Sequence, residues 1–158
     1  RERGSVNPRN PTRINQRAAA VGVTTAAKAE EQGLTPKMRK VARAESGVEP
    51  SIMGSGPIPA VEKVLDKAGL TVDDLDTIEL NEAFASVAAA CSTALGLPSE
   101  KTNPNGGAIA LGHPVGATGA ILTVKTMYEL ERIDGRYGLV SLCIGGGQGI
   151  ATIFERVN

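Results

Sequence analysis

Short apolar runs alternate along this chain with stretches in which apolar residues recur at helical spacing. Runs of this length, bounded by turn residues, are typical of buried strands. They predict strands at residues 18–24, 38–48, 75–80, 137–143 and 150–154. Four helices are expected between them: one capped by Thr24 or Thr25 and ending near Gln32 before Gly33, one ending at Gly69, one capped by Asn81, and one between Gly116 and Gly135.

The spacing within these stretches also predicts which helix faces are apolar. The helix before Gly69 carries Val61, Val64, Leu65 and Ala68 on one face. The helix after Asn81 carries Phe84, Val87, Ala88 and Cys91, and the last helix has Ile121, Val124 and Tyr128 on one stripe. Strands that alternate with helices and end in a closing strand pair predict an α/β layered domain with a mixed sheet.

The first 17 residues differ from the rest of the chain. They are rich in Arg, Asn and Pro and show no apolar period, so we treat residues 1–17 as a separate N-terminal segment and residues 18–158 as the domain. The sequence begins with Arg1 rather than Met, which we interpret as a sign that it is part of a longer protein.

Composition removes several classes of function. Lys plus Arg equal Asp plus Glu at 17 each, and aromatic residues make up 3%, which argues against a nucleic-acid or membrane-surface protein. Two Cys and one His are too few for a four-ligand zinc site, so no metal is expected. Free thiols and the lack of an apolar run of about 20 residues predict a protein of a reducing compartment. We expect the cytoplasm, or the mitochondrial matrix if a leader preceded this chain.

Three segments place polar residues where a predicted strand ends or a glycine-rich loop begins, as active sites often do. They contain Asn81, His113 and Cys143. Each has a structural alternative: Asn81 as a helix cap, His113 as a packed or surface residue, and Cys143 as a buried structural thiol. The chemical interpretation is proton transfer by His113 and Cys143, with the Gly145 N–H beside the thiol as a donor to an oxyanion.

Taken together, the three segments resemble the thiolase family. The resemblance is carried by Asn-Glu-Ala-Phe at 81–84, Gly-His-Pro at 112–114, Cys-Ile-Gly-Gly-Gly at 143–147 and Met-Gly-Ser-Gly-Pro-Ile-Pro at 53–59. It covers about residue 5 to the end. It implies the C-terminal half of an acyltransferase, with a layered α-β-α fold. Coenzyme A and acyl-CoA are the implied substrates, with no permanently bound cofactor.

The resemblance also implies roles for individual residues. His113 stands where the family activates a nucleophilic cysteine and holds a thioester oxygen, and Asn81 where it positions a water for that oxygen. Cys143 stands at the acid–base cysteine, and the Gly145 N–H at a second oxyanion hole. The positions that match the pantetheine channel are Thr12, Met53, Ala83 and Phe84.

Two departures from the family pattern matter. The nucleophilic cysteine belongs to the half of a thiolase that this sequence lacks, and Cys91 on its apolar helix face is expected to be core. Arg9, Arg13 and Arg17 stand where the family has glycine. If any of these positions needs a positive φ, arginine is strained there by about 1–2 kcal/mol. A solvated surface, contact with CoA phosphates and altered or weakened CoA binding are the open interpretations, of which we favour the last.

The leading hypothesis is therefore a catalytic half that needs the N-terminal half as its partner and forms a homo-oligomer when complete. Alone, it should expose a large apolar face. A non-catalytic thiolase-like remnant is the alternative, favoured by the arginines and opposed by the intact Asn81, His113 and Cys143. Ketoacyl-synthase chemistry needs a second histidine, and this chain has one.

Overall fold

The computed structural model describes residues 6–7 and 9–157; residues 1–5 and 8 of the N-terminal segment, and residue 158, lie outside the described residues. The strands are β1 (Met38–Gly47), β2 (Thr77–Leu80), β3 (Tyr137–Ile144) and β4 (Gln148–Arg156). The helices are α1 (Ala26–Glu31), the 3₁₀ helix η1 (Pro50–Ser55), α2 (Pro57–Ala68), α3 (Ala85–Leu95), α4 (Ala108–Leu111) and α5 (Thr118–Ile133).

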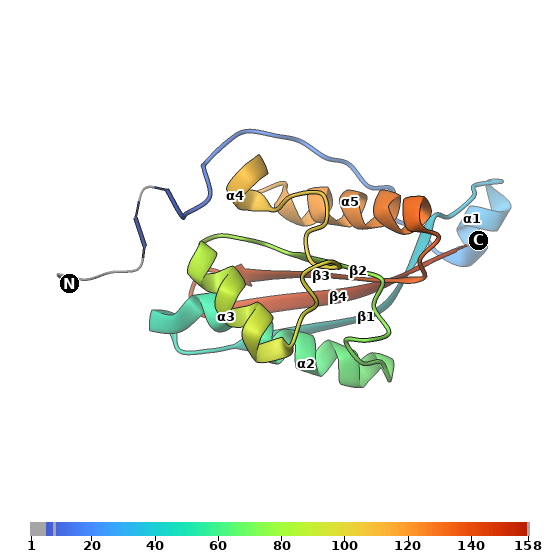
Figure 1. Cartoon of the computed structure of the whole chain (residues 1–158). Coiled ribbons are helices and arrows are strands. Elements are labelled where there is room, and N and C mark those ends of the chain that lie inside the picture. The colour runs from blue at the N-terminus through green and yellow to red at the C-terminus, as the bar shows by residue number, and fades with distance from the viewer. Residues whose placement is uncertain (1–5, 8, 158) are drawn as a thin grey trace.

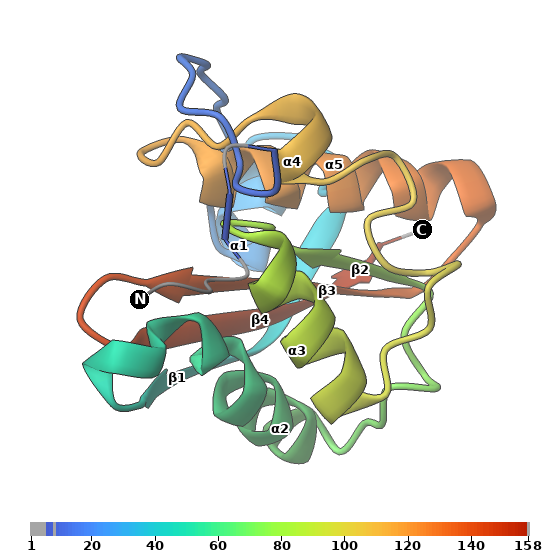
Figure 2. The same ribbon diagram turned by 60° about the vertical axis from the view of Figure 1, so that its left-hand side comes forward.

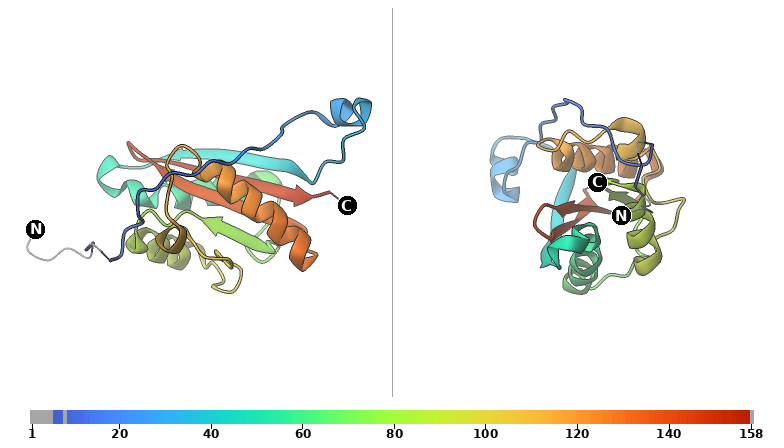
Figure 3. Two further views of the ribbon diagram at one scale, coloured as in Figure 1. Left: turned by 90° about the horizontal axis from the view of Figure 1, so that it is seen from above. Right: turned by 90° about the vertical axis from the view of Figure 1, so that its left-hand side faces the viewer.

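The described strands form one mixed sheet in the order β1-β4-β3-β2. β3 and β4 are an antiparallel hairpin, β1 pairs antiparallel with β4, and β2 runs parallel to β3. Helices α2 and α3 cover one face of the sheet, while α4 and α5 lie over the other (Figure 1). The end-on view in Figure 3 shows the same three layers. The predicted α/β fold with a layered α-β-α arrangement and a mixed sheet is confirmed.

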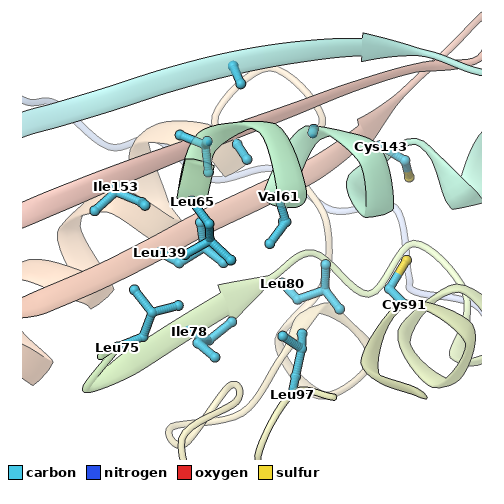
Figure 4. Close-up of a cluster of buried hydrophobic side chains, with 14 of the residues drawn as sticks. Val61, Leu65, Leu75, Ile78, Leu80, Cys91, Leu97, Leu139, Cys143 and Ile153 are labelled. Carbon is cyan, nitrogen blue, oxygen red and sulfur yellow. The ribbon is translucent and has the colours of Figure 1, made fainter. Parts of the chain in front are cut away.

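The main core lies between the sheet and the α2–α3 layer (Figure 4). Val61 and Val64 on α2 are fully buried, as the helical spacing predicts, and they pack with Ile78, Leu139 and Ile153 of the strands. Helix α2 ends at Gly69, whose left-handed φ of 65° forms the C-cap. The predicted helix and its apolar face are therefore confirmed.

The layer between α5 and the sheet is much more polar. Leu122 and Leu130 of α5 are buried there, but so are Thr126 and, on β2, Thr77 and Glu79. The Ile121–Val124–Tyr128 stripe is not the buried face of the helix: the first two side chains are half-buried and Tyr128 is 57% exposed. The apolar stripe of α5 is thus turned away from the sheet.

Two sequence-based expectations about local structure are wrong. Residues 18–24 form no strand: they are irregular and mostly exposed between the N-terminal segment and α1, and Val23 is 89% exposed. Three alanines and a glycine bury little apolar area and have low strand propensity, so this run has little to hold it against a sheet edge.

Asn81 is not a helix cap. Helix α3 begins at Ala85, and residues 82–84 stay outside it because the N-terminal segment pairs with them. The Thr12 N–H donates to the Ala83 carbonyl at 3.1 Å, and the Ala85 N–H donates to the Asn10 carbonyl at 2.9 Å. This pairing, between segments about 70 positions apart, frees the Asn81 side chain for another use.

Gly149 gives a test of how closely the backbone packs near the β3–β4 turn. A Cβ at Gly149 would overlap the Gly56 carbonyl oxygen, so Gly149→Ala is expected to lower the free energy of unfolding by about 1–3 kcal/mol, the usual cost of overpacking. Gly47→Ala is the matched control, because nothing lies within 4 Å of a Cβ there. Urea unfolding of both variants checks this, and equal midpoints would contradict it.

Candidate active site

The Asn81 side chain lies at the carboxyl end of β2, on the α5 side of the sheet. The backbone N–H of Asn81 donates to the Ser141 carbonyl of β3 at 2.9 Å, which continues the β2–β3 pairing by one residue. The residue is 1% exposed, and its Nδ2 lies 3.4 Å from Nε2 of His113. The structure therefore brings together two of the predicted site residues, which are 32 positions apart in the sequence.

Thr118 fixes the proton on the His113 ring. The Thr118 hydroxyl donates to the Pro114 carbonyl at 2.9 Å, so its oxygen is left to accept from His113 Nδ1–H at 2.6 Å. Nδ1 then carries the proton, and Nε2 presents a lone pair to Asn81. Burial lowers the pKa of His113 from its ordinary value of 6.5, so the ring is neutral at pH 7. A neutral ring with a bare Nε2 is the form that accepts a proton.

The N-terminal segment holds the loop that carries His113. Asn15 Nδ2 donates to the Leu111 carbonyl at 2.9 Å, and the His113 N–H donates to the Arg13 carbonyl at 3.0 Å. The Thr12 hydroxyl donates to the Ala108 carbonyl at 2.7 Å, so this predicted pantetheine contact has a structural partner on α4. Figure 2 shows the segment lying against α4.

A cavity of about 340 Å³ opens beside Asn81, between the N-terminal segment, α4 and α5. Its walls are mostly apolar, with Arg17 and Lys125 as the charged side chains that line it. The Asn81 Oδ1 atom is buried and has no hydrogen-bond partner among the described residues. A buried acceptor of this kind is normally satisfied by a water or a ligand donor.

Cys143 lies on the opposite side of the sheet from this cavity. Side chains alternate along β3, so Cys143 shares a face with Leu139 and enters the main core, where it is 9% exposed. Burial raises the pKa of the Cys143 thiol above its ordinary value of 9.0, so it stays protonated at neutral pH. The structure does not bring Cys143 into hydrogen bonding with Asn81 or His113, although β2 and β3 end side by side.

Cys143 shares its surroundings with three of the predicted channel residues. Met53, Ala83 and Phe84 are partly buried and pack against the same core cluster. Cys91 is fully buried at this end of the cluster too (Figure 4), and its thiol donates to the Gly54 carbonyl at 3.4 Å. Burial, with a smaller effect of Cys143, raises the pKa of Cys91 to about 11. Cys91 is a core residue, as predicted.

Gly145 lies exposed in the turn between β3 and β4. Its carbonyl accepts from the Gln148 side chain at 3.1 Å, and the next two glycines take φ values of 78° and 85°. Only glycine adopts such angles readily, which explains the glycine run after Cys143. The turn therefore begins at about Gly145, two positions after Cys143.

Comparison with known proteins shows the family to which this chain belongs. Residues 34–156 match the family model described as the thiolase C-terminal domain. The chain belongs to the thiolase family. A beta-ketothiolase of Cupriavidus necator is 55% identical over 157 residues, which cover 99% of this chain and 40% of that protein. The cytosolic acetyl-CoA acetyltransferase of Rattus norvegicus is 48% identical over 153 residues, covering 97% of this chain and 38% of that protein.

A solved thiolase shares the fold as well. The human mitochondrial 3-ketoacyl-CoA thiolase in complex with CoA superposes with a TM-score of 0.83 at 47% identity, over 84% of this chain and 34% of that one. This chain thus spans about 40% of the length of the relatives it matches. The match to the family model begins at residue 34, so the matched region includes the four described strands and lies after α1.

The three arginines of the N-terminal segment carry no backbone strain. Arg9, Arg13 and Arg17 are exposed, and none is among the described non-glycine residues with positive φ, which are Asn103 and Asp134. The segment accepts arginine at these positions without leaving the ordinary backbone regions. The condition under which arginine would be strained here, a positive φ, is therefore not met at any of the three positions.

Sequence reasoning missed the residues that hold the site residues in place. Thr118 fixes the His113 ring, and Asn103 accepts from the Leu80 N–H and donates to its carbonyl, both at 2.9 Å. Lys125 connects α5 to β2 through Glu79. None of these partners follows from spacing, because each depends on which helix lies over which strand.

Proposed function

We propose that this chain is the C-terminal catalytic half of a thiolase that transfers acyl groups between acyl-CoA and CoA or acetyl-CoA. The observation that carries the proposal is the contact between the buried Asn81 and the partly buried His113, with a neutral ring and a bare Nε2 at the motif positions of the family. CoA and acyl-CoA are the substrates, and no permanently bound cofactor is needed. Fatty-acid metabolism is the setting that fits these substrates.

In cleavage of a 3-ketoacyl-CoA, the thiol of a cysteine in the N-terminal half attacks the keto carbon while His113 Nε2 takes the thiol proton. The new S–C bond forms as the bond between the keto carbon and the α-carbon breaks. Its electron pair goes to the enolate of acetyl-CoA, which Cys143 protonates. A raised pKa suits Cys143 to this step, because the thiol is present as an acid at neutral pH.

The second step returns both groups to their starting state. The Cys143 thiolate takes the proton of CoA, whose sulfur attacks the acyl-enzyme and releases the shortened acyl-CoA. The leaving cysteine recovers its proton from His113. A water that donates one hydrogen to the unpartnered Asn81 Oδ1 can donate its other hydrogen to the thioester oxygen, and the Gly145 N–H serves the second oxyanion.

Thr12, Met53, Ala83 and Phe84 line the pantetheine path in this proposal. In support, Met53, Ala83 and Phe84 pack against the same core cluster as Cys143, the proposed acid–base thiol. Thr12 keeps a free lone pair on a hydroxyl that already donates to Ala108, so it can accept a pantetheine N–H.

The missing N-terminal half is the expected partner of the α5 side. Three exposed apolar side chains belong to the N-terminal segment, the turn before α5 and α5 itself: Ile14 is 94%, Val115 74% and Tyr128 57% exposed. Residues 20–24, which include Val21 and Val23, are also exposed and lie outside any strand of the described structure. Both features fit a face that another polypeptide covers. The complete protein is then expected to form a homo-oligomer.

We place the protein in the cytoplasm. In support, a relative at 48% identity is named a cytosolic acetyl-CoA acetyltransferase. Among the described helices, none is long and apolar enough to cross a membrane.

The deciding test is CoA-dependent cleavage of acetoacetyl-CoA by this chain alone and joined to the N-terminal half of a close thiolase relative. We expect no turnover by the chain alone and turnover by the joined protein. Cys143→Ala should abolish that turnover without unfolding the protein. A folded joined protein without turnover would contradict the proposal and favour a thiolase-like remnant that keeps the fold.

A further inference from the structure

Glu82 directly follows Asn81, and its carboxylate is bound entirely to the segment that leads to His113. Oε2 accepts from the Ile109 N–H at 3.0 Å, and Oε1 accepts from Asn103 Nδ2 at 3.3 Å. Ile109 is in the first turn of α4, which ends two residues before His113. The carboxylate therefore joins the end of β2 to the helix that carries the histidine loop.

Gly107 shows that this contact shapes the backbone around it. A Cβ on Gly107 would overlap the Glu82 carboxyl carbon and both of its oxygens. Gly107 has a φ of −98°, which any residue adopts, so the glycine is not required by backbone conformation. The absence of a side chain at Gly107 is what lets the carboxylate sit on α4.

Glu82 differs from the other anchors of this segment in where it is attached. Asn15 and Arg13 hold the far end of the segment, but they belong to the N-terminal segment. Asn103, ten positions before His113, hydrogen-bonds the loop to the Leu80 backbone. Glu82 is adjacent to Asn81 and binds the helix just before His113, so its bonds join the backbone next to Asn81 to the helix that precedes His113.

We propose that Glu82 is a positioning residue, whose carboxylate fixes α4 against the end of β2 and so holds the His113 imidazole beside Asn81. Only its effect on turnover rests on the proposed function. A carboxylate that merely stabilised α4 would leave the protonation and tautomer of His113 unchanged when removed.

The lone histidine makes the test direct, because the ¹⁵N and Cε1–H NMR signals of an imidazole come from His113 alone. In the unaltered chain we expect the Nδ1–H tautomer and titration below pH 6.5. In Glu82→Ala we expect a mixture of tautomers, a His113 pKa closer to 6.5, and exchange of the Ile109 amide about tenfold faster. Glu82→Gln should fall between the two, because one amide oxygen replaces two acceptors.

Glu62→Gln is the matched control, since Glu62 is an exposed glutamate on α2, on the opposite face of the sheet. It should leave all His113 signals unchanged. Unaltered His113 signals in a folded Glu82→Ala variant would overturn the proposal. If Glu82→Ala does not fold, the same criterion applies to Glu82→Gln.

A double-mutant cycle with Gly107 adds an independent criterion. Gly107→Ala alone should displace Glu82 and shift the His113 signals as Glu82→Ala does. Combined with Glu82→Ala it should add little, because the overlap with the carboxylate is gone. Additive shifts in the double variant would show that Gly107 acts on His113 independently of Glu82 and would count against the proposal.

Turnover of the joined protein then separates this proposal from the proposed function. Glu82→Ala is expected to lower kcat about tenfold or more with a smaller change in KM, because a misplaced base affects the chemical step. Altered His113 signals in a joined protein that never turns over would leave the positioning role standing and overturn the acyl-transfer function. Altered signals with unchanged kcat would remove the role of Glu82 in turnover.

Discussion

His113→Ala in the joined protein is expected to lower kcat for acetoacetyl-CoA cleavage by about 10²–10⁴-fold, the usual contribution of a positioned general base. The reason is that Nε2 is the bare nitrogen of a neutral ring that Thr118 and Asn81 hold from both sides. KM should change much less, because the ring acts on the reacting thiol. Steady-state kinetics with thermal unfolding as a folding control checks this.

The pH dependence of kcat/KM tests the same assignment. Burial lowers the pKa of His113 below 6.5, so the proton acceptor is lost only when the pH falls below that value. The acid limb of the profile should therefore lie below pH 6.5 in the unaltered protein and be absent in His113→Ala. Cys143 keeps its proton to above pH 9.0, so it should cause no alkaline loss below that pH. An acid limb centred above pH 6.5 would contradict the role of His113.

The sequence was most informative where one element determines its own structure. The core face of α2 and its end at Gly69 follow from local spacing and one left-handed residue. The β3–β4 hairpin follows from two apolar runs around a glycine turn. The side of the sheet on which Cys143 lies could also have been predicted, because alternation along β3 puts it with Leu139.

The expectations that were wrong depend on partners far away in the chain. Asn81 has the residue type of a helix cap, but pairing between residues 10–12 and 83–85 delays the start of α3. The stripe of α5 has the spacing of a buried face, yet the helix turns Thr126 and Leu130 to the sheet. The side of the helix that is buried here depends on Glu79 below it, which no local pattern reveals.

Lys125→Met is expected to lower the free energy of unfolding by about 3–5 kcal/mol, the typical cost of removing one partner of a buried ion pair. Lys125 Nζ lies 2.6 Å from Glu79 Oε2, the Glu79 side chain is fully buried, and that of Lys125 is 16% exposed. The other carboxylate oxygen, Oε1, has no hydrogen-bond partner among the described residues. Without Lys125, the carboxylate is left buried and unpaired, and urea unfolding at pH 7 measures the loss.

The size of this loss should depend on pH. Burial raises the pKa of Glu79 above its ordinary value of 4.5, and Lys125 opposes that rise, so the pKa is higher still in Lys125→Met. The unfolded chain ionises Glu79 near pH 4.5, whereas the folded variant holds the proton to a higher pH. The penalty therefore begins above pH 4.5 and grows with rising pH until the pH exceeds the folded-state pKa of Glu79 in the variant. A constant difference between variant and unaltered chain from pH 4.5 to 7 would contradict this explanation.

Two further variants test whether the loss of stability comes from the buried charge left unpaired or simply from removing a lysine. Lys37→Met removes an ion pair with Glu131 in which both side chains are about half-exposed, and it should leave the free energy of unfolding nearly unchanged. Lys125→Met combined with Glu79→Met removes both charges, so most of the stability should return. The double variant still lacks the bond from Lys125 Nζ to the Gly106 carbonyl, at 2.6 Å, that anchors the His113 loop. Recovered stability together with lowered kcat in the joined protein would therefore show that Lys125 serves both the α5–sheet contact and the placement of His113.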